Sequence, residues 1–316
     1  MREKIFDMHC DTILEMMERE QGVKKNTLHL DLERMAAHEN YIQVFAAFID
    51  QKGISVSPMT ACVAMLHKIH EEIEKNKDRI RLIQSEKDLK AAAAQNGCGA
   101  ILSIEGAEAL EGSLSNLWMY DRLGVRLITL TWNYANELAD GITESRGGGL
   151  TDFGRQAVAM MEDMGILVDV SHLSRKGFWD VAAVTKHPFV ASHSCVYALC
   201  QHPRNLDDEQ IRLLIDRGGG IGMNFYPQFL SYSGSCGIDT ILSHMEYILD
   251  RGGDQTLGLG SDFDGVDTLP DGIRGAENMQ DLIDAMRKRR WPKELIECVC
   301  FGNFYRIFAQ TLARRK

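Results

Sequence analysis

The first informative segment of the chain is Ile5-Phe6-Asp7-Met8-His9-Cys10-Asp11, an apolar run that ends in a histidine and an aspartate two residues apart. An apolar run of this length is typical of a buried strand. Because residues two apart on a strand project to the same side, His9 and Asp11 can bind one ion. A single pair of this kind is more often a hydrogen-bonded or exposed histidine, so the pattern of the remaining chain must decide.

The same alternation of a short apolar run and a longer amphipathic segment extends along almost the whole chain. Such alternation is typical of a parallel sheet whose strands are joined by helices. Eight strands with a helix after most of them favour an α/β fold of the (β/α)8 TIM-type barrel over a six-stranded doubly wound sheet. The expected strands span residues 5–9, 41–49, 100–105, 126–131, 166–170, 189–193, 220–225 and 256–260.

The expected helices are amphipathic, and no composition change marks a domain boundary between them. We therefore expect a single domain over residues 1–316. One helix illustrates the pattern, because its apolar residues recur at helical spacing and predict one buried face. These residues are Met59, Cys62, Val63, Leu66, Ile69 and Ile73.

Composition limits the classes of function. The 316 residues are 45% hydrophobic, which is enough for a large core and excludes disorder as the main state. The chain has 35 Lys plus Arg against 45 Asp plus Glu, a net charge of −10, so neither a nucleic-acid nor an anionic-membrane partner is expected. The first residues lack the apolar run of a signal peptide, which predicts a cytoplasmic protein.

Metal-binding side chains follow five of the eight expected strands. In a barrel of this type, the carboxyl ends of all strands gather on one face, where the active site lies. Three histidines with carboxylates suit a divalent ion such as Zn(II), and a shared carboxylate can bridge two ions about 3.5 to 4 Å apart. The candidate residues are His9, Asp11, Glu105, His172, His193 and Asp262.

Two further positions after strands are candidates for substrate binding. Arg204 can form a surface ion pair with Asp207 or Asp208, or its guanidinium can hold a substrate carboxylate by two hydrogen bonds. Tyr226 follows the seventh expected strand, where it offers an aromatic wall with a polar tip or packs in the core. Other histidines, including His244, have no second ligand at a useful spacing, and no role is expected for them.

The ordered motifs of the chain resemble those of the membrane dipeptidase (renal dipeptidase) family of zinc peptidases, within the amidohydrolase-type barrels. The resemblance covers nearly the whole chain. It is carried by DMHCD at 7–11, IEGAEAL at 104–110, DVSH at 169–172, SHS at 192–194, HPRN at 202–205, NFY at 224–226 and GSDFDG at 260–265.

The resemblance implies a homodimeric barrel with two zinc ions. It places His9 and Asp11 on one ion and His172 and His193 on the other, and it assigns the bridge between both ions to one carboxylate, that of Glu105. Asp262 then corresponds to the acid/base carboxylate. Arg204 corresponds to the arginine that grips the free carboxylate of the dipeptide.

One departure from the family pattern concerns the residue after the fourth expected strand. Many members carry TLTH there, with a histidine that contacts the substrate, whereas this chain has Trp132 at that place. Trp offers one N–H donor and no cation. Either Asn133 or Asn136 supplies the missing contact, or the substrate range and rate differ. A second departure is the missing secretory signal and lipid-anchor tail, which predicts an intracellular version.

These observations predict a metal-dependent dipeptidase, in which a hydroxide bridging two zinc ions attacks the peptide bond and Asp262 transfers the proton. The expected partner is a small dipeptide. One alternative is a related amidohydrolase acting on N-acyl amino acids, lactams or lactones, because loops easily retarget barrel chemistry. An alternative of another class is a non-catalytic metal-binding protein.

Overall fold

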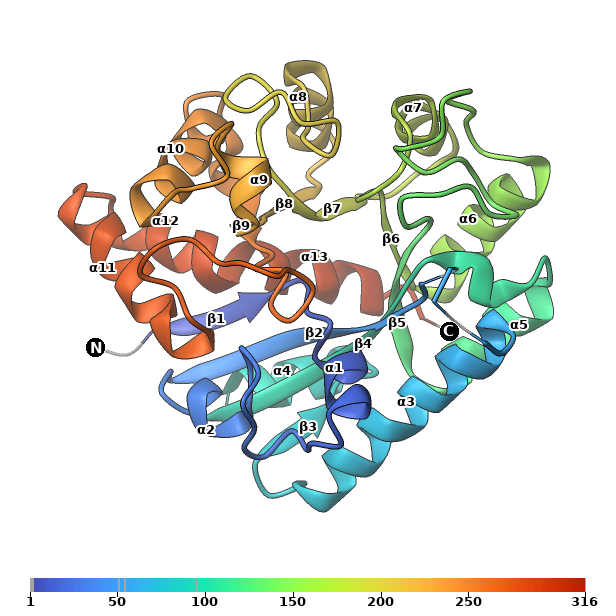
Figure 1. Ribbon diagram of the computed structural model, residues 1–316, viewed down its shortest axis with the longest axis horizontal. Helices are drawn as coiled ribbons and strands as arrows, with labels where there is room; N and C mark the ends of the chain where they lie inside the picture. The colour runs from blue at the N-terminus through green and yellow to red at the C-terminus, as the bar shows by residue number, and fades with distance from the viewer. Residues whose placement is uncertain (1–2, 51, 54, 95, 316) are drawn as a thin grey trace.

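The computed structural model describes residues 3–50, 52–53, 55–94 and 96–315, and eight of its strands form a closed parallel barrel (Figure 1). The hydrogen-bonded order around the ring is β2-β1-β9-β8-β7-β6-β5-β4, and a β2–β4 pairing closes it. The predicted (β/α)8 fold is therefore confirmed. The barrel strands are β1 (Lys4–Asp7), β2 (Asn40–Phe48), β4 (Gly97–Glu105), β5 (Val125–Thr129), β6 (Leu167–Asp169), β7 (Val190–Ser194), β8 (Gly220–Met223) and β9 (Leu257–Leu259).

All eight expected strands are present, with ends shifted by a few residues at most. A further short strand, β3 (Ile80–Leu82), pairs with the first part of β4, while β5 pairs with its last part. Three residues are too few for a clear alternation of apolar and polar side chains, which is why the sequence pattern missed β3.

Helices surround the barrel on its outside (Figure 1). They are α1 (Thr12–Glu18), α2 (Leu32–Met35), α3 (Pro58–Lys75), α4 (Glu86–Ala94), α5 (Leu114–Arg122), α6 (Asp152–Met164), α7 (Arg175–Val184), α8 (Asp208–Asp216), α9 (Pro227–Leu230), α10 (Ile238–Leu249), α11 (Met279–Lys288), α12 (Lys293–Glu297) and α13 (Asn303–Leu312). None of the described helices is both long and apolar enough to cross a membrane.

Helix α3 carries the expected amphipathic pattern with one correction. Cys62, Leu66 and Ile69 are buried as predicted, but Val63 is 37% exposed. Met65 takes its place on the buried face. At 100° per residue, position 65 lies nearer the centre of the stripe defined by 62, 66 and 69 than position 63 does.

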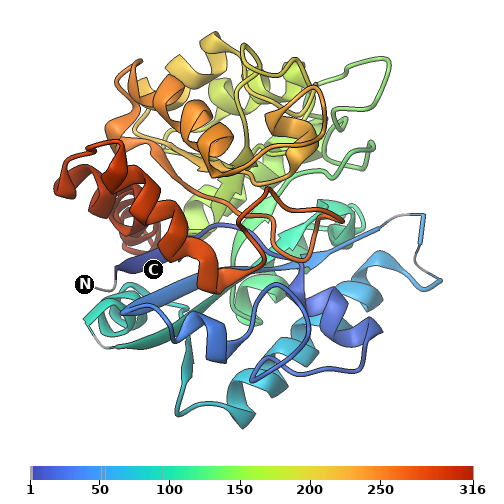
Figure 2. The same cartoon turned by 60° about the vertical axis from the view of Figure 1, so that its left-hand side comes forward.

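The amino-terminal end of the barrel is filled by aromatic side chains and closed by the last helix. The ring of Phe6 on β1 stacks on Phe308 of α13 at 5.4 Å and packs against Phe304 at 6.2 Å. Figure 2 shows the carboxyl-terminal helices beside β1. All three rings are fully or almost fully buried. Burial of such a ring stabilises the fold by roughly 1.5–3 kcal/mol. Because apolar side chains fill this end of the barrel, the candidate site lies at the opposite end.

Candidate metal centre and substrate cavity

The candidate ligands meet at the carboxyl end of the barrel, although they are far apart in the sequence. Two overlapping groups have ligand atoms that all lie within 4.8 Å of one another, and all of their members are buried. The first group is His9, Glu105 and His193, and the second is His9, Asp11 and Asp262. His172 lies beside the first group, with its Nε2 atom 2.9 Å from the Nε2 atom of His193.

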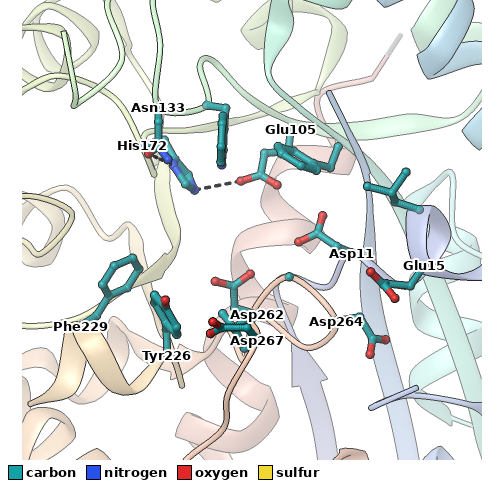
Figure 3. Close-up of a pocket in the computed structure, with 15 residues that line it drawn as sticks. Asp11, Glu15, Glu105, Asn133, His172, Tyr226, Phe229, Asp262, Asp264 and Asp267 are labelled. Atoms are coloured by element: carbon teal, nitrogen blue, oxygen red, sulfur yellow. Dashed lines mark hydrogen bonds and ion pairs between the residues drawn. The ribbon is translucent and has the colours of Figure 1, made fainter. Parts of the chain in front are cut away.

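Glu105, the last residue of β4, occupies the centre of this cluster. Its Oε2 atom lies 3.2 Å from Nε2 of His9. Its Oε1 atom lies on the other side, 2.9 Å from Nε2 of His172 and 3.5 Å from Nε2 of His193. One carboxylate thus turns one oxygen toward His9 and the other toward His172 and His193, which is the arrangement that a bridging ligand requires. Figure 3 shows the contact between Glu105 and His172.

Two more carboxylates complete the side of the cluster that contains His9. The Oδ2 atom of Asp11 lies 3.4 Å from Nε2 of His9, and the Oδ1 atom of Asp262 lies 3.8 Å from the same nitrogen. Asp11 immediately precedes α1, so the chain leaves β1 and turns into the helix at the site. The side chains of His9 and Asp11 therefore meet at one point, as their spacing of two residues predicts.

Strained backbone holds two of these residues in place. His172 has a φ of 65° and Asp262 a φ of 62°. Residues with a side chain beyond Cβ adopt this left-handed region rarely, and it costs of order 1–3 kcal/mol unless the surroundings enforce it. Each is the third residue after the end of a barrel strand, β6 for His172 and β9 for Asp262, so both lie in the turns at the carboxyl end of the barrel.

Burial keeps two of the imidazoles neutral. Burial lowers the pKa of His172 to about 3, and the positive charge of Arg204 acts in the same direction. Burial and the neighbouring charge of His9 hold the pKa of His193 well below its usual value. Neutral imidazole is the form that binds a metal ion, because the ligating nitrogen must keep its lone pair.

The carboxylates of the cluster compete for positive charge. Burial raises the pKa of Asp11 to about 7, and repulsion by Glu105 adds to this effect. Burial also raises the pKa of Asp262. Burial would lower the pKa of His9, but the charges of Glu105 and Asp11 outweigh it and raise this pKa well above its usual value. Such a cluster is stabilised by a cation at its centre.

Unpaired buried atoms indicate that the cluster fits divalent ions. Nε2 of His9 lies near the carboxylates of Glu105 and Asp11, yet it makes no hydrogen bond of suitable geometry with the described residues, and neither does the buried Oδ1 atom of Asp11. An unpaired buried polar atom is costly, and metal coordination is one way to satisfy it. Three imidazoles and two or three carboxylates form a donor set that suits Zn(II) and also accepts Mn(II) or Co(II).

A second layer of hydrogen bonds orients His193. Its Nδ1 atom lies 2.7 Å from Oγ of Ser192, whose hydroxyl donates to Oδ2 of Asp169 at 2.5 Å. Asp169 is fully buried and also accepts from the hydroxyl of Thr129 at 2.6 Å. Partners of this kind fix the ring orientation of a ligating histidine. The sequence shows Asp169 only as the first residue of the DVSH motif and does not indicate this role.

A cavity of about 390 Å³ opens onto the cluster (Figure 3). Its wall includes Asp11, Glu105, His172 and Asp262 from the cluster. Its other lining residues include the aromatic side chains of Phe48, Trp132, Tyr226 and Phe229, together with Asn133 and Asp267. The two predicted substrate contacts Trp132 and Tyr226 therefore both line the cavity. The Trp132 ring is held edge-on by Phe48 at 5.1 Å and by Tyr134 at 5.4 Å.

Asp262 is held by Asn224, for which no separate role was expected from the sequence. The Nδ2 group of Asn224 donates to Oδ2 of Asp262 at 2.8 Å, and Oδ1 of Asn224 accepts from the backbone N–H of Tyr226 at 2.6 Å. Oδ2 of Asp262 is therefore occupied, and Oδ1 faces the cluster. The position of Asn224 could have identified it from the sequence, because it follows β8 directly, just as the candidate ligands come after barrel strands.

Arg204 is only 6% exposed, and it does not pair with Asp207 or Asp208. Its Nη2 group donates to the carbonyl oxygen of His193 at 3.2 Å, and its guanidinium faces the ring of Phe229, a residue that lines the cavity, at 5.4 Å. The buried Nε has no hydrogen-bond partner among the described residues. The surface ion pair considered from the sequence is therefore wrong, because Asp207 caps α8 and pairs with Arg175 instead.

Comparison with known sequences gives matches over most of the chain. A family model described as membrane dipeptidase, peptidase family M19, matches residues 1–316. An uncharacterized dipeptidase of Schizosaccharomyces pombe is 33% identical over 302 residues, which cover 90% of this chain and 73% of that protein. An uncharacterized protein of Klebsiella pneumoniae is 34% identical over 239 residues, which cover 72% of this chain and 88% of that protein.

Solved structures give matches over nearly the whole chain. A crystal structure of a metallopeptidase described as dipeptidase AC superposes with a TM-score of 0.91 at 28% identity, covering 99% of both chains. A metallopeptidase from Rhodobacter sphaeroides, solved with a phosphinate mimic of the dipeptide L-Ala-D-Ala, superposes with a TM-score of 0.90 at 28% identity. That match covers 98% of this chain and 100% of the other.

Proposed function

Because this chain belongs to the membrane dipeptidase family of metallopeptidases, we propose that it hydrolyses the peptide bond of dipeptides at a centre of two divalent ions, with zinc favoured. The observation that carries the proposal is the placement of Glu105 between His9 on one side and His172 with His193 on the other. A mononuclear site needs no carboxylate with an oxygen directed to each of two histidine sets.

In this proposal His9 and Asp11 hold one ion, His172 and His193 hold the other, and Glu105 binds both. When bound, two such ions polarise the carbonyl group of the substrate and activate a water molecule near neutral pH. The remaining chemistry belongs to side chains of this chain. His172 and His193 stay neutral because they are buried, so their Nε2 lone pairs stay available to the centre.

Asp262 is the residue proposed to move the proton. Asn224 occupies its Oδ2 atom, so Oδ1 is the atom that faces the cluster and the cavity. Burial raises the pKa of this carboxyl, which makes it a better base than an exposed aspartate. Oδ1 takes the proton of the attacking water and returns it to the nitrogen of the leaving amine.

Arg204 is proposed to hold the free carboxylate of the dipeptide. Its buried Nε lacks a partner, and a carboxylate is the anion that matches a guanidinium with two parallel hydrogen bonds. A closed contact with that carboxylate leaves no room for further residues, which explains a preference for dipeptides over longer chains. The aromatic wall of Trp132 and Tyr226 is proposed to enclose the substrate side chains.

A hydrolysis panel tests the proposal. Purified protein with added Zn(II), Mn(II) or Co(II) is offered dipeptides, tripeptides and N-acetyl amino acids, and released amines are quantified. Dipeptide cleavage without tripeptide cleavage is the expected result. Cleavage of N-acetyl amino acids alone would instead identify a related amidohydrolase, for which the apolar Trp132 would form an acyl pocket. If the protein binds metal but cleaves none of these substrates, the result would favour a non-catalytic metal-binding protein.

The single domain, the homodimer and the cytoplasmic location remain predictions of the sequence. Light scattering after size-exclusion chromatography checks the dimer, limited proteolysis checks the domain organisation, and cell fractionation checks the location.

A further inference from the structure

The loop after β5 holds Asn133 by its backbone. The backbone N–H of Thr143 donates to the carbonyl oxygen of Asn133 at 3.0 Å. Gly141 packs so closely that a Cβ atom there would lie 2.4 Å from the carbonyl carbon of Asn133. Both contacts involve main-chain atoms of Asn133, so its backbone position does not depend on its side chain.

The side chain of Asn133 contacts a candidate ligand of the metal centre. Its Oδ1 atom lies 2.8 Å from Nδ1 of His172 (Figure 3). Because Nε2 of His172 faces Oε1 of Glu105 and must keep its lone pair to bind an ion, the ring proton sits on Nδ1. Nδ1 therefore donates and Oδ1 of Asn133 accepts, which also fixes the orientation of the carboxamide.

The three histidines of the centre differ in this respect. Nδ1 of His193 contacts Ser192, which passes the contact on to the fully buried Asp169. Nδ1 of His9 has no hydrogen-bond partner among the described residues. Only His172 is oriented by a residue that itself lines the cavity, so a substrate in the cavity can contact the residue that orients a ligand.

The Nδ2 group of the Asn133 carboxamide can donate a hydrogen bond. With Oδ1 turned to His172, the Nδ2 group of Asn133 has no hydrogen-bond partner among the described residues. Asn136 cannot take the same part, because its Nδ2 group donates to Glu108 and to the carbonyl oxygen of Leu130, and its Oδ1 accepts from backbone N–H groups. Burial and the nearby charge of Asp267 raise the pKa of the Tyr226 hydroxyl.

We propose that Asn133 contacts both the metal centre and the substrate: its Oδ1 atom fixes the ring of His172, and its Nδ2 group donates a hydrogen bond to the peptide group of the dipeptide. The substrate half of this inference rests on the proposed dipeptidase function. The His172 half rests on the contact alone.

Two substitutions separate the halves. Asn133→Asp keeps an acceptor for Nδ1 of His172 and loses the donor. Asn133→Leu has a similar size and loses both. Tyr134→Phe, in the next position of the same loop, keeps the ring that packs against Trp132 and loses only the hydroxyl, so it controls for disturbance of the loop.

Metal binding is measured without substrate, by competition with a chelator and by the Co(II) absorption spectrum. We expect Asn133→Leu to bind the weaker equivalent 10- to 100-fold less tightly with an altered spectrum, as is typical when the partner of a ligating histidine is lost. Tyr134→Phe should bind like the wild type, and Asn133→Asp at least as tightly, because a carboxylate partner raises the basicity of a ligating histidine. Unchanged affinity and spectrum in Asn133→Leu would overturn the His172 half.

Steady-state kinetics at saturating metal test the donor. Both Asn133 variants should lose at least about tenfold in kcat/KM for a dipeptide, the order expected for one lost hydrogen bond to substrate, while Tyr134→Phe stays within about twofold. Wild-type kcat/KM in Asn133→Asp would overturn the substrate half. If the wild type cleaves no dipeptide, the proposed function and the substrate half fall together, whereas the chelator competition still decides the contact with His172.

Discussion

The Nε2 atoms of His172 and His193 lie 2.9 Å apart, and both face the Oε1 atom of Glu105. Burial lowers the pKa of both imidazoles, so both rings are neutral. With the ring protons on the Nδ1 atoms, which face Asn133 and Ser192, both Nε2 atoms carry lone pairs that repel one another. A cation bound between them and Glu105 turns this repulsion into coordination. The geometry is therefore that of a ligand set, and it makes Glu105 the residue on which metal content should depend most strongly.

Replacing Glu105 with alanine should remove most of the bound metal. The wild type should hold up to two divalent ions per chain, and the variant should lose most of both because one carboxylate serves both sites. Elemental analysis of protein purified in parallel checks this. Glu15→Gln, which changes another carboxylate lining the cavity, should keep its metal. Full metal content in Glu105→Ala would remove the bridging role.

Replacing Asp262 with asparagine should separate proton transfer from metal binding. The variant keeps an oxygen that can accept from Asn224, so the fold and much of the metal should persist. Its kcat should fall by on the order of a hundredfold or more, as expected for a missing general base. Glu15→Gln, which changes another carboxylate of the same cavity, is the control and should change kcat little. Near-normal kcat in Asp262→Asn would mean that another group moves the proton.

Replacing Arg204 should affect only substrates with a free carboxylate. Arg204→Ala should cost a few kcal/mol of transition-state binding with free dipeptides, as is typical for truncation of a buried charge that pairs with a ligand. The loss should shrink for the same dipeptides with an amidated carboxyl end. Arg204→Lys keeps the positive charge but loses the two parallel N–H donors, so its loss of transition-state binding should be smaller than that of Arg204→Ala. Equal losses for free and amidated substrates would favour a structural role, through the contact with the His193 carbonyl.

His244 should make stability depend on pH. It is buried beneath the loop after β7, where Nδ1 accepts from the backbone N–H of Val196 and Nε2 contacts the carbonyl oxygen of Leu230. Burial lowers the pKa of His244 to about 4, and the contact with Leu230 opposes this only partly. The unfolded chain takes up the proton near pH 6.5, so stability from this group is present above that pH and is lost as the pH falls toward 4.

Urea unfolding at pH 7 and pH 5 checks the His244 prediction. The wild type should be more stable than His244→Gln at pH 7, and the difference in unfolding free energy should shrink by about 2 kcal/mol at pH 5. Loss of metal at low pH affects both proteins alike and cancels in the comparison. A constant difference between the two pH values would show that His244 does not titrate in this way.

The sequence predicted the barrel well because the signals were periodic and numerous. Each barrel strand is an apolar run followed by a helical pattern, and the candidate ligands follow strands whose ends must meet on one face. The exposed Val63 and the short β3 were not predictable, because a single residue at the edge of a helix face and a three-residue strand leave almost no periodic signal.

The ligand positions could be predicted more readily than their supports. His9, Glu105 and His193 belong to recognisable motifs, whereas Asn133 and Asn224 matter only through partners 38 or 39 residues away in the sequence. Asparagine is also common in loops, where it bonds to nearby backbone, so its identity alone points to no partner. The choice between Asn133 and Asn136 required knowing that Asn136 is held by Glu108 and Leu130.

Metal titration of the stripped protein tests the central claim most directly. After removal of metal by a chelator, Zn(II) or Co(II) is added stepwise while hydrolysis of a free dipeptide is followed. Activity should be absent at the start, rise with added ion and level off at two equivalents per chain, and Glu105→Ala should not recover at the same concentrations. Dipeptide hydrolysis that persists at the full rate in the stripped protein, or that levels off at one equivalent, would contradict a two-ion centre built around Glu105.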